Sequence, residues 1–549
     1  MIEAPPYLDR GMKKLDVPGL ILFIKYRSLP SVITMVFWGR ASTLLLACVP
    51  LINVAALSVR DASAPSDELL VNTASGKVQG FYNNTAHTVR AFLGVPFAAA
   101  PIGPSRFLPP QARQSSSSVI KATSWPPSCP GLLSGLPSAT FSSLPYFPIA
   151  GLNEDCLTVN VWTPSASRFK KGQLLPVSIY IYGGSFDEGG TSVLAYEATD
   201  LVANQDIVVV TLNYRVTIFG NPNSPYLASK GGPVNIGLLD QRFAIEWLQK
   251  NVASFGGDPE RMIAFGQSAG SVSAGFMPFA YPKNPIVTGV GELSAPTLIS
   301  GDAIVMPGIA QGNFTDIASA VGCAPGNTTD KQIFECMQNV PWKTLTDYIN
   351  GHPEKNYLFR IVADGITAFK DIPARIAAGK LAKIPQFNGQ LENEGDSLVP
   401  SSPDGIDQAA ADAFGYALLV CPAAREAQLR VDAGLKTFRY RYSGIYPNLS
   451  PYPFLRTYHN SDVPMWFGSV NTIKGLKENT TAEQKKQSAY MQGALAAFTK
   501  DPEQGLIKYG WPLYQGNKGK TLVHLDPRNS SELVVFESPA EFDAPCGSA

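Results

Sequence analysis

Charged residues are scarce in this 549-residue chain, and neither sign dominates. Charged residues make up only 16%, and 44 Lys and Arg residues balance 44 Asp and Glu residues. A chain without net charge lacks the basic surface that binds nucleic acid or an anionic membrane. We therefore expect a small or apolar ligand and no nucleic-acid partner. Hydrophobic residues reach 45%, which is typical of a globular chain and not of a disordered one.

Patterns that bind metals or nucleotides are also missing. The sequence contains no CxxC pair, no cysteine–histidine cluster and no GxGxxG motif. These patterns are typical of zinc sites, redox motifs and dinucleotide-binding folds. The sequence therefore predicts a protein that works with neither a metal nor a cofactor.

The apolar run near the N-terminus, residues 43–57, is too short for a membrane-spanning helix. It holds about 15 residues and includes Pro50, whereas a span needs roughly 20 apolar residues. Arg40 precedes the run and small residues follow it, as in a secretory signal peptide cleaved between 56 and 64. A membrane anchor is the alternative interpretation.

The position of this signal divides the chain into three parts. The signal follows Met35, so residues 35–57 are the predicted signal peptide. Residues 1–34 form an N-terminal extension of unknown role, unless Met35 is the true start. Residues 65–549 are predicted to form a single domain, without an internal repeat.

Cysteines and glycosylation sequons agree with export. Of seven cysteines, Cys48 lies inside the predicted signal, and the remaining six suit three disulfides in an oxidising compartment. Six Asn-x-Ser/Thr sequons provide candidate glycosylation sites, and they begin at Asn83, Asn313, Asn327, Asn448, Asn479 and Asn529. We expect a secreted glycoprotein.

Strands and helices alternate along the chain. Residues 175–182 and 207–213 are apolar, β-branched runs typical of strands buried on both faces of a parallel sheet. Residues 236–255 carry apolar side chains at helical spacing, and 261–265 form another buried strand. This alternation predicts an α/β fold with a large, mainly parallel sheet. Further strands are expected at 69–81, 88–93, 384–391, 437–442, 521–525 and 533–536, and a helix at 482–500.

The segment Gly266-Gln267-Ser268-Ala269-Gly270 matches the nucleophile-elbow motif Gly-x-Ser-x-Gly. In that motif the serine lies on a sharp strand-to-helix turn, and its backbone is strained so that its hydroxyl is exposed. Glycines flank the serine because larger side chains would collide there. Ser268 is the predicted nucleophile, and the dipole of the following helix faces the negative charge that develops.

A glycine-rich turn, Gly183-Gly184-Ser185, ends the strand at 175–182. Such a turn presents successive backbone N–H groups to the oxyanion of a tetrahedral intermediate. We predict an oxyanion hole made of the backbone amides of Gly184, Ser185 and Ala269.

Only four histidines can supply a base: His87, His352, His459 and His524. In folds built on such an elbow, the triad follows the order serine, acid, histidine along the chain, which excludes His87. His524 lies within an apolar strand, and His352 leaves little room for an acid between it and the serine. His459 lies in a polar loop after the strand at 437–442, and it is the predicted base.

The acid is less well defined by the residues alone. The predicted strand at 384–391 is followed by Glu392 and Glu394, and either carboxylate could orient the imidazole. Spacing does not decide between them.

Several of these segments together resemble the type-B carboxylesterase/lipase family, particularly its secreted fungal members, from about Leu70 to the C-terminus. The most specific stretch runs from 235–242 through Phe255-Gly256-Gly257-Asp258-Pro259 to the elbow. The others are 154–162, 182–186 and 213–216. The resemblance implies an α/β-hydrolase fold, with antiparallel strands on the N-terminal side of the sheet, and a serine carboxylic-ester hydrolase.

The resemblance also assigns residues. The family's Asn-Glu-Gly triplet matches Asn393-Glu394-Gly395, which makes Glu394 the acid, and its base matches His459. It implies disulfides Cys129–Cys156 and Cys323–Cys336, and by remainder Cys421–Cys546.

Two departures from the family bear on the substrate. Ser185 replaces a third glycine, and Gln267 stands where cholinesterases carry glutamate. No tryptophan lies between Cys129 and Cys156, so the cation–π contact that binds choline lacks its aromatic group. We expect an uncharged ester and an acyl-enzyme mechanism. A triacylglycerol lipase, a tailoring esterase of secondary metabolism and a non-catalytic binding protein are the alternatives.

Overall fold

The computed structural model describes most of the chain after residue 66 and little before it. The described residues are 12–17, 20–25, 67–132, 148–170, 172–299, 307–402, 404–450, 452–473, 479–528 and 530–547. The predicted signal peptide, residues 35–57, lies outside them, as does Asn529. No helix among the described residues has both the length and the apolarity that crossing a membrane requires.

Residues 1–62 and 63–549 form two separate compact units. In the first unit, β1 (Met12–Val17) pairs with β2 (Leu20–Lys25) as an antiparallel hairpin. This hairpin lies in the extension for which the sequence predicted no structure.

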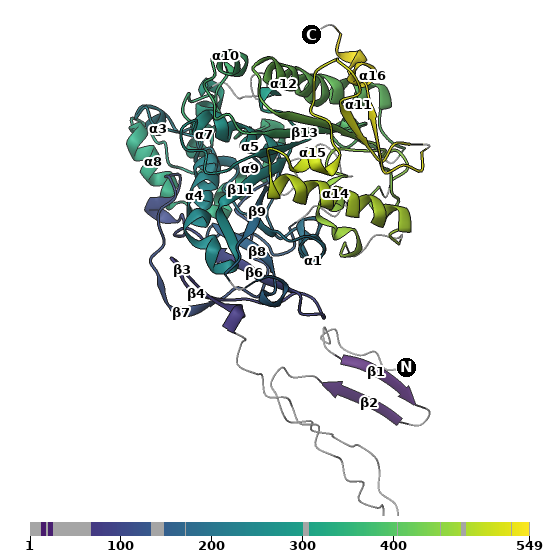
Figure 1. The fold of residues 1–549 in the computed structure, drawn as a ribbon. Coiled ribbons are helices and arrows are strands. Elements are labelled where there is room, and N and C mark those ends of the chain that lie inside the picture. The colour runs from purple at the N-terminus through teal and green to yellow at the C-terminus, as the bar shows by residue number, and fades with distance from the viewer. Residues whose placement is uncertain are drawn as a thin grey trace, which may run out of the picture. The chain divides into compact units, whose positions relative to one another are not determined.

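The second unit is built on a sheet of 11 described strands, whose order is β16-β15-β14-β13-β12-β11-β9-β10-β8-β6-β5. Its middle part can be followed in Figure 1 from β13 through β11, β9 and β8 to β6. Its centre, from β10 to β15, is entirely parallel. The parallel strands are β9 (Leu175–Ile181), β10 (Val208–Leu212), β11 (Gly257–Gln267), β12 (Val290–Leu293), β13 (Gln386–Leu391), β14 (Thr437–Tyr442) and β15 (Leu522–Leu525).

Antiparallel strands complete both ends of this sheet. They are β5 (Phe81–Tyr82), β6 (Val89–Pro96) and β8 (Thr158–Pro164) at one end and β16 (Val534–Glu537) at the other. A separate small sheet contains β3 (Leu70–Thr73), β4 (Gly76–Gln79) and β7 (Ser116–Lys121). A mainly parallel sheet with antiparallel strands on its N-terminal side confirms the predicted fold class.

Helices cover both faces of the sheet. Adjacent residues of a strand point to opposite faces: Phe265 packs on Phe467 of α13, whereas Gly266 abuts α5. The helices are α1 (Thr199–Asn204), α2 (Thr217–Gly220), α3 (Pro225–Ala228), α4 (Ile236–Asn251), α5 (Ala269–Ala280), α7 (Pro307–Ala320), α8 (Asp330–Asn339), α9 (Trp342–Gly351), α10 (Ile372–Ala377), α11 (Gln408–Gly415), α12 (Cys421–Asp432), α13 (Val463–Phe467), α14 (Ala482–Lys500), α15 (Gly505–Tyr509) and α16 (Pro539–Phe542).

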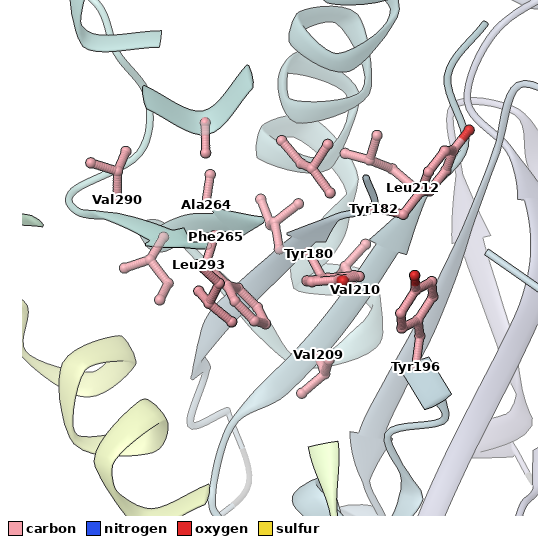
Figure 2. Packing of buried hydrophobic residues seen from close by; sticks show 14 of the residues in the cluster. Tyr180, Tyr182, Tyr196, Val209, Val210, Leu212, Ala264, Phe265, Val290 and Leu293 are labelled. Atoms are coloured by element: carbon pink, nitrogen blue, oxygen red, sulfur yellow. The ribbon is translucent and has the colours of Figure 1, made fainter. Parts of the chain in front are cut away.

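The core lies along the central strands, as their apolar sequences require. Every residue of β9 and β10 is buried, because parallel strands covered on both faces leave no side for solvent. Tyr180 packs against Phe265 at a ring distance of 5.0 Å, and Figure 2 shows them within the layer of aliphatic side chains. This rigid layer supports the loops at the carboxyl ends of the strands.

Candidate active site

Ser268 occupies the sharp turn between β11 and α5. Its φ of 56° and ψ of −125° lie outside the regions that ordinary residues adopt. A Cβ at Gly266 would lie 2.3 Å from the backbone of Gly270, and one at Gly270 would lie 2.0 Å from the carbonyl oxygen of Ile181. The two glycines are therefore required for the strand and helix to meet at this angle, as the elbow motif predicts.

The predicted oxyanion turn follows β9 directly. Gly184 and Ser185 have positive φ values of 109° and 56°, and both line the same cavity as Ser268. Tyr182 and Tyr214 fix the strand end by donating hydroxyl hydrogen bonds of 2.9 Å to each other's carbonyl oxygens. Ala269 is the first residue of α5, where a backbone N–H has no partner inside the helix.

His459 and Glu394 are brought together from two loops that follow β13 and β14. His459 Nδ1 lies 2.7 Å from Glu394 Oε2, and the other carboxylate oxygen accepts a 2.8 Å hydrogen bond from the backbone N–H of Leu391. The Glu394 side chain is fully buried. A carboxylate held in this way fixes the tautomer of the imidazole, with its Nδ1 proton toward Glu394.

The alternative residues do not reach this position. Glu392 lies 3.5 Å from Arg528 and is 30% exposed. His87 stacks on Tyr82, and His352 contacts the carbonyl oxygen of Tyr348. His524 lies in β15, as expected of a strand residue, and contacts Ser443.

Ser268 and His459 line one cavity with about 950 Å³ of empty space, part of which is open to solvent. No hydrogen bond joins the two residues within the described part of the chain. His459 Nε2 instead lies 3.0 Å from Nε2 of Gln267, the residue before the serine. The remaining wall is mixed, with apolar Leu132, Pro148, Leu152 and Leu398 and polar Glu188, Tyr196 and Asn460.

Two further buried carboxyls lie close to this cavity. Burial raises the pKa of Asp462 to about 6, and the nearby Glu394 carboxylate adds to the effect, although Trp466 and Tyr440 donate hydrogen bonds to Asp462. Burial also raises the pKa of Asp187 to about 7, against the opposing charge of Arg360. Neither carboxyl could be recognised from the sequence, since no pattern around Asp187 or Asp462 marks it as buried.

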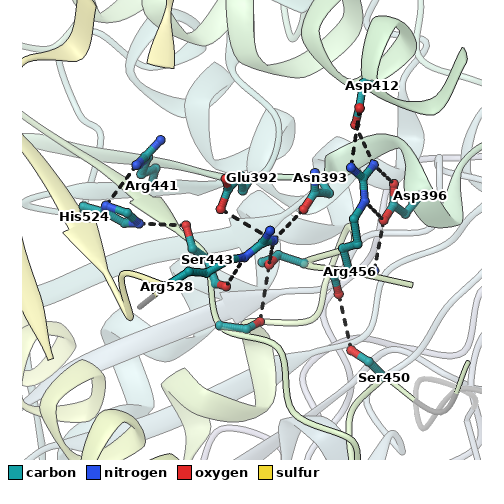
Figure 3. Close-up of polar contacts among 12 residues, drawn as sticks. Glu392, Asn393, Asp396, Asp412, Arg441, Ser443, Ser450, Arg456, His524 and Arg528 are labelled. Carbon is teal, nitrogen blue, oxygen red and sulfur yellow. Dashed lines mark hydrogen bonds and ion pairs between the residues drawn. The ribbon is translucent and has the colours of Figure 1, made fainter. Parts of the chain in front are cut away.

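Arg528 connects the two loops that carry Glu394 and His459. Its Nη2 donates to Asn393 Oδ1 at 2.8 Å and to Thr457 Oγ1 at 3.2 Å, and its Nε donates to the Ser443 carbonyl oxygen at 3.3 Å (Figure 3). Asn393 precedes Glu394, and Thr457 lies two residues before His459. Sequence reasoning missed this contact because the three partners are far apart along the chain.

The cysteines and sequons are distributed as follows. Disulfides join Cys129 to Cys156, Cys323 to Cys336 and Cys421 to Cys546. Among the described sequons, Asn327 and Asn479 are exposed, Asn83 and Asn313 are half-buried and Asn448 is buried.

Comparisons with known proteins extend these observations. The sequence model of the carboxylesterase family matches residues 67–413. Secreted lipase 5 of Gibberella zeae is 33% identical over 532 residues, which cover 90% of this chain and 96% of the relative. A chlorogenic acid esterase of Aspergillus niger is 34% identical over 487 residues, 85% of this chain and 92% of the relative.

An acetylcholinesterase of Bungarus fasciatus is also similar, at 28% identity over 536 residues, or 86% of this chain and 84% of the relative.

The secreted lipase and the three disulfides confirm the predicted location outside the cell or in the secretory pathway.

Proposed function

The chain belongs to the carboxylesterase family, and from this premise we propose a secreted serine esterase that cleaves uncharged carboxylic esters through an acyl-enzyme on Ser268. The observation that carries the proposal is the arrangement of His459. Its Nδ1 is held by Glu394 at 2.7 Å, and its ring lines the cavity into which Ser268 is exposed. A serine, an imidazole and a carboxylate in this relation are the parts of nucleophilic acyl transfer.

In the first half-reaction, Ser268 Oγ attacks the ester carbonyl while His459 Nε2 accepts its proton. Glu394 stabilises the positive charge that forms on the imidazole. The carbonyl oxygen becomes an oxyanion, which the backbone amides of Gly184, Ser185 and Ala269 stabilise. His459 then gives the proton to the departing alkoxide, and the alcohol leaves the acyl group on Ser268.

In the second half-reaction, water takes the place of the alcohol. His459 accepts a proton from the water, which attacks the acyl carbonyl, and the oxyanion occupies the same three amides. Collapse of this intermediate breaks the bond to Ser268 Oγ, and the returned proton restores the serine. The carboxylic acid then leaves the cavity.

Hydrolysis of p-nitrophenyl butyrate by the wild type and by Ser268→Ala tests the proposal. We expect the variant to lose at least about 10³-fold in kcat, because only binding and the oxyanion hole remain. A covalent fluorophosphonate label should appear on Ser268 in the wild type alone. An inactive, unlabelled but cooperatively folded wild type would instead support the non-catalytic binding alternative.

The lining of the cavity supports an uncharged ester. Leucine and proline side chains form part of its wall. Among the described lining residues, the acidic side chain is that of Glu188. A lipase remains the second candidate because a secreted lipase is among the relatives. The chlorogenic acid esterase among them makes esters of phenolic acids a further candidate class.

A substrate profile separates these candidates. The panel contains p-nitrophenyl acetate, butyrate and palmitate, an emulsified triacylglycerol, methyl caffeate and butyrylthiocholine. Interfacial activation on the emulsion would identify a lipase, and a preference for methyl caffeate a phenolic esterase. We expect butyrylthiocholine to be hydrolysed more slowly than p-nitrophenyl butyrate, which carries the same acyl group. The reason is that residues 129–156 lack the tryptophan that binds choline in cholinesterases.

A further inference from the structure

Both ring nitrogens of His459 are occupied in the structure. Glu394 holds Nδ1 at 2.7 Å, and the side-chain amide of Gln267 lies 3.0 Å from Nε2. Nε2 is the atom that must accept the serine proton in the proposed function. The side chain that contacts Nε2 belongs to Gln267, which directly precedes Ser268 in the sequence. Gln267 therefore acts on the imidazole of His459 and not directly on the ester.

The direction of this hydrogen bond follows from the partners. A carboxylate only accepts, so Nδ1 carries the proton and Nε2 presents its lone pair. The amide nitrogen of Gln267 only donates, so it donates to that lone pair. This hydrogen bond exists only while the imidazole is neutral, because a protonated Nε2 would place two N–H groups against each other.

Gln267 has little freedom to adopt another position. The residue is 2% exposed, and its Oε1 lies against the oxyanion turn, where a Cβ at Gly183 would come within 2.8 Å of it. The carboxamide thus lies between the turn that binds the oxyanion and the ring that moves the proton.

We propose that Gln267 is a positioning residue that holds His459 neutral and correctly oriented in the free enzyme, so that the esterase stays active at mildly acidic pH. The inference rests on the proposed function of Ser268, His459 and Glu394. In the free enzyme, a donor to the lone pair stabilises the neutral imidazole, and this hydrogen bond gives way when Ser268 Oγ donates to the same lone pair. A carboxylate at the same place would stabilise the protonated form, which cannot act as the base. The choice of glutamine over glutamate therefore sets the acidic limit of activity.

Other titratable groups also surround His459. Glu394 and Tyr440 lie on the side of Nδ1, Glu188 and Tyr196 line the cavity, and Asp462 is buried close to Glu394. The pKa of Asp462, raised by burial to about 6, falls in the range where the acidic limb is expected. Each comparison is therefore repeated in an Asp462→Asn background.

The test is the pH profile of kcat/KM for phenyl acetate, followed by pH-stat between pH 4.5 and 9. We expect Gln267→Glu to move the midpoint of the acidic limb upward by about one pH unit, with plateau activity within tenfold of wild type. Gln267→Met should lower kcat about 3-fold to 10-fold with little change in KM, and move the midpoint upward by less. Superimposed acidic limbs for wild type and Gln267→Glu overturn the proposal.

Gln241→Met is the matched control. Gln241 is also a buried glutamine, 1% exposed, but its amide donates to Ser273 on α5 at 3.1 Å and not to the triad. This variant should change the melting temperature and leave the pH midpoint in place. If Gln267→Glu lacks a cooperative melt, Gln267→Met decides: a midpoint equal to that of wild type then overturns the proposal.

A second measurement does not depend on turnover. With only four histidines in the chain, ¹⁵N-histidine NMR spectra can be assigned with His459→Gln. The resonances of His459 should change with pH at a higher midpoint in Gln267→Glu than in wild type, and equal midpoints contradict the positioning role. Loss of the proposed esterase function would appear separately, as a wild type without Ser268-dependent hydrolysis.

Discussion

Glu392 and Glu394 lie two residues apart, yet only one of them reaches the imidazole. β13 ends at Leu391, and the chain then turns so that Glu394 folds back on its own strand end and accepts the Leu391 N–H. Spacing could not distinguish the two residues because the turn, and not the interval, decides the direction of each side chain. Family resemblance favoured Glu394, and the geometry places its carboxylate on His459.

The pair provides a matched test of the acid. Glu394→Gln should lower kcat by about 10²-fold to 10⁴-fold, because an amide cannot stabilise the imidazolium and can favour the wrong tautomer. Glu392→Gln changes an equivalent charge in the same loop and should keep kcat within about threefold. Steady-state kinetics on p-nitrophenyl butyrate measures both, and equal losses in the two variants would contradict the assignment.

Asp462 shows how a buried carboxyl affects the pH dependence of stability. Its pKa is raised by burial to about 6 from an ordinary value of 3.8, so the folded state retains its proton at a higher pH than the unfolded state does. Its contribution to stability is therefore complete below about pH 4 and is lost as pH rises to and past 6. A shift of about two units corresponds to on the order of 3 kcal/mol.

We expect Asp462→Asn to remove this component. The amide oxygen can still accept from Tyr440 and Trp466, which donate to Asp462 Oδ2 at 3.0 Å each, and it does not ionise. Urea unfolding at pH 4.5 and pH 7 measures the effect: the free energy of unfolding of the variant should exceed that of wild type by more at pH 7 than at pH 4.5, where only part of the Asp462 contribution has been lost. An equal difference at both pH values would show that Asp462 does not titrate in this range.

At the scale of elements, strands and helices with a regular apolar pattern could be predicted, including the short β15 and β16, and elements without such a pattern could not. The expectations at 437–442 and 482–500 coincide with β14 and α14, because their patterns are long and regular. β12 has only four residues and includes buried Glu292, so no apolar run marks it. The helices of 307–351 were not predicted, although the capping box that begins α8 at Thr329 is visible in the sequence.

The loops after β13 and β14 were predicted to carry the acid and the base, but the residue that joins these loops was not predicted. Arg528, which follows β15, donates to Asn393 and Thr457 in those loops. We expect Arg528→Met to lower kcat about 3-fold to 30-fold, because small displacements of catalytic groups reduce rate strongly, while KM changes little.

Arg441→Met is the control for this prediction. Arg441 pairs with Glu537 and contacts His524, and it makes no hydrogen bond or ion pair with Glu394 or His459 among the described residues, so its loss should affect stability more than kcat. Arg528→Lys keeps the charge without the planar fork and should recover only part of the rate. Full activity of Arg528→Met on p-nitrophenyl butyrate would remove the proposed alignment role.

At the scale of the whole molecule, the sheet ends in short antiparallel strands, β5 and β16, which limits the exposed edge available for pairing with other chains. The C-terminal segment is held on the β16 side by two links. Arg439 donates to Asp543 at 2.8 Å, and Cys421 at the start of α12 is bonded to Cys546. From the sequence, the Cys421–Cys546 disulfide could be assigned only as the pair that remained after the other two, because no local pattern connects residues 125 positions apart.

The disulfides allow a prediction about how chain closure stabilises the fold. Cys421–Cys546 closes a separation of 125 residues and Cys323–Cys336 one of 13. Because a longer closed loop removes more entropy from the unfolded chain, the expected contributions are about 5 and about 3 kcal/mol. The double variant Cys421→Ser/Cys546→Ser should therefore lose more stability than Cys323→Ser/Cys336→Ser.

Both double variants should keep kcat at 25 °C, since neither cysteine pair contacts Ser268, Glu394 or His459. Urea unfolding with a p-nitrophenyl butyrate assay measures both quantities, and equal or reversed losses would show that contacts in the folded state outweigh loop closure.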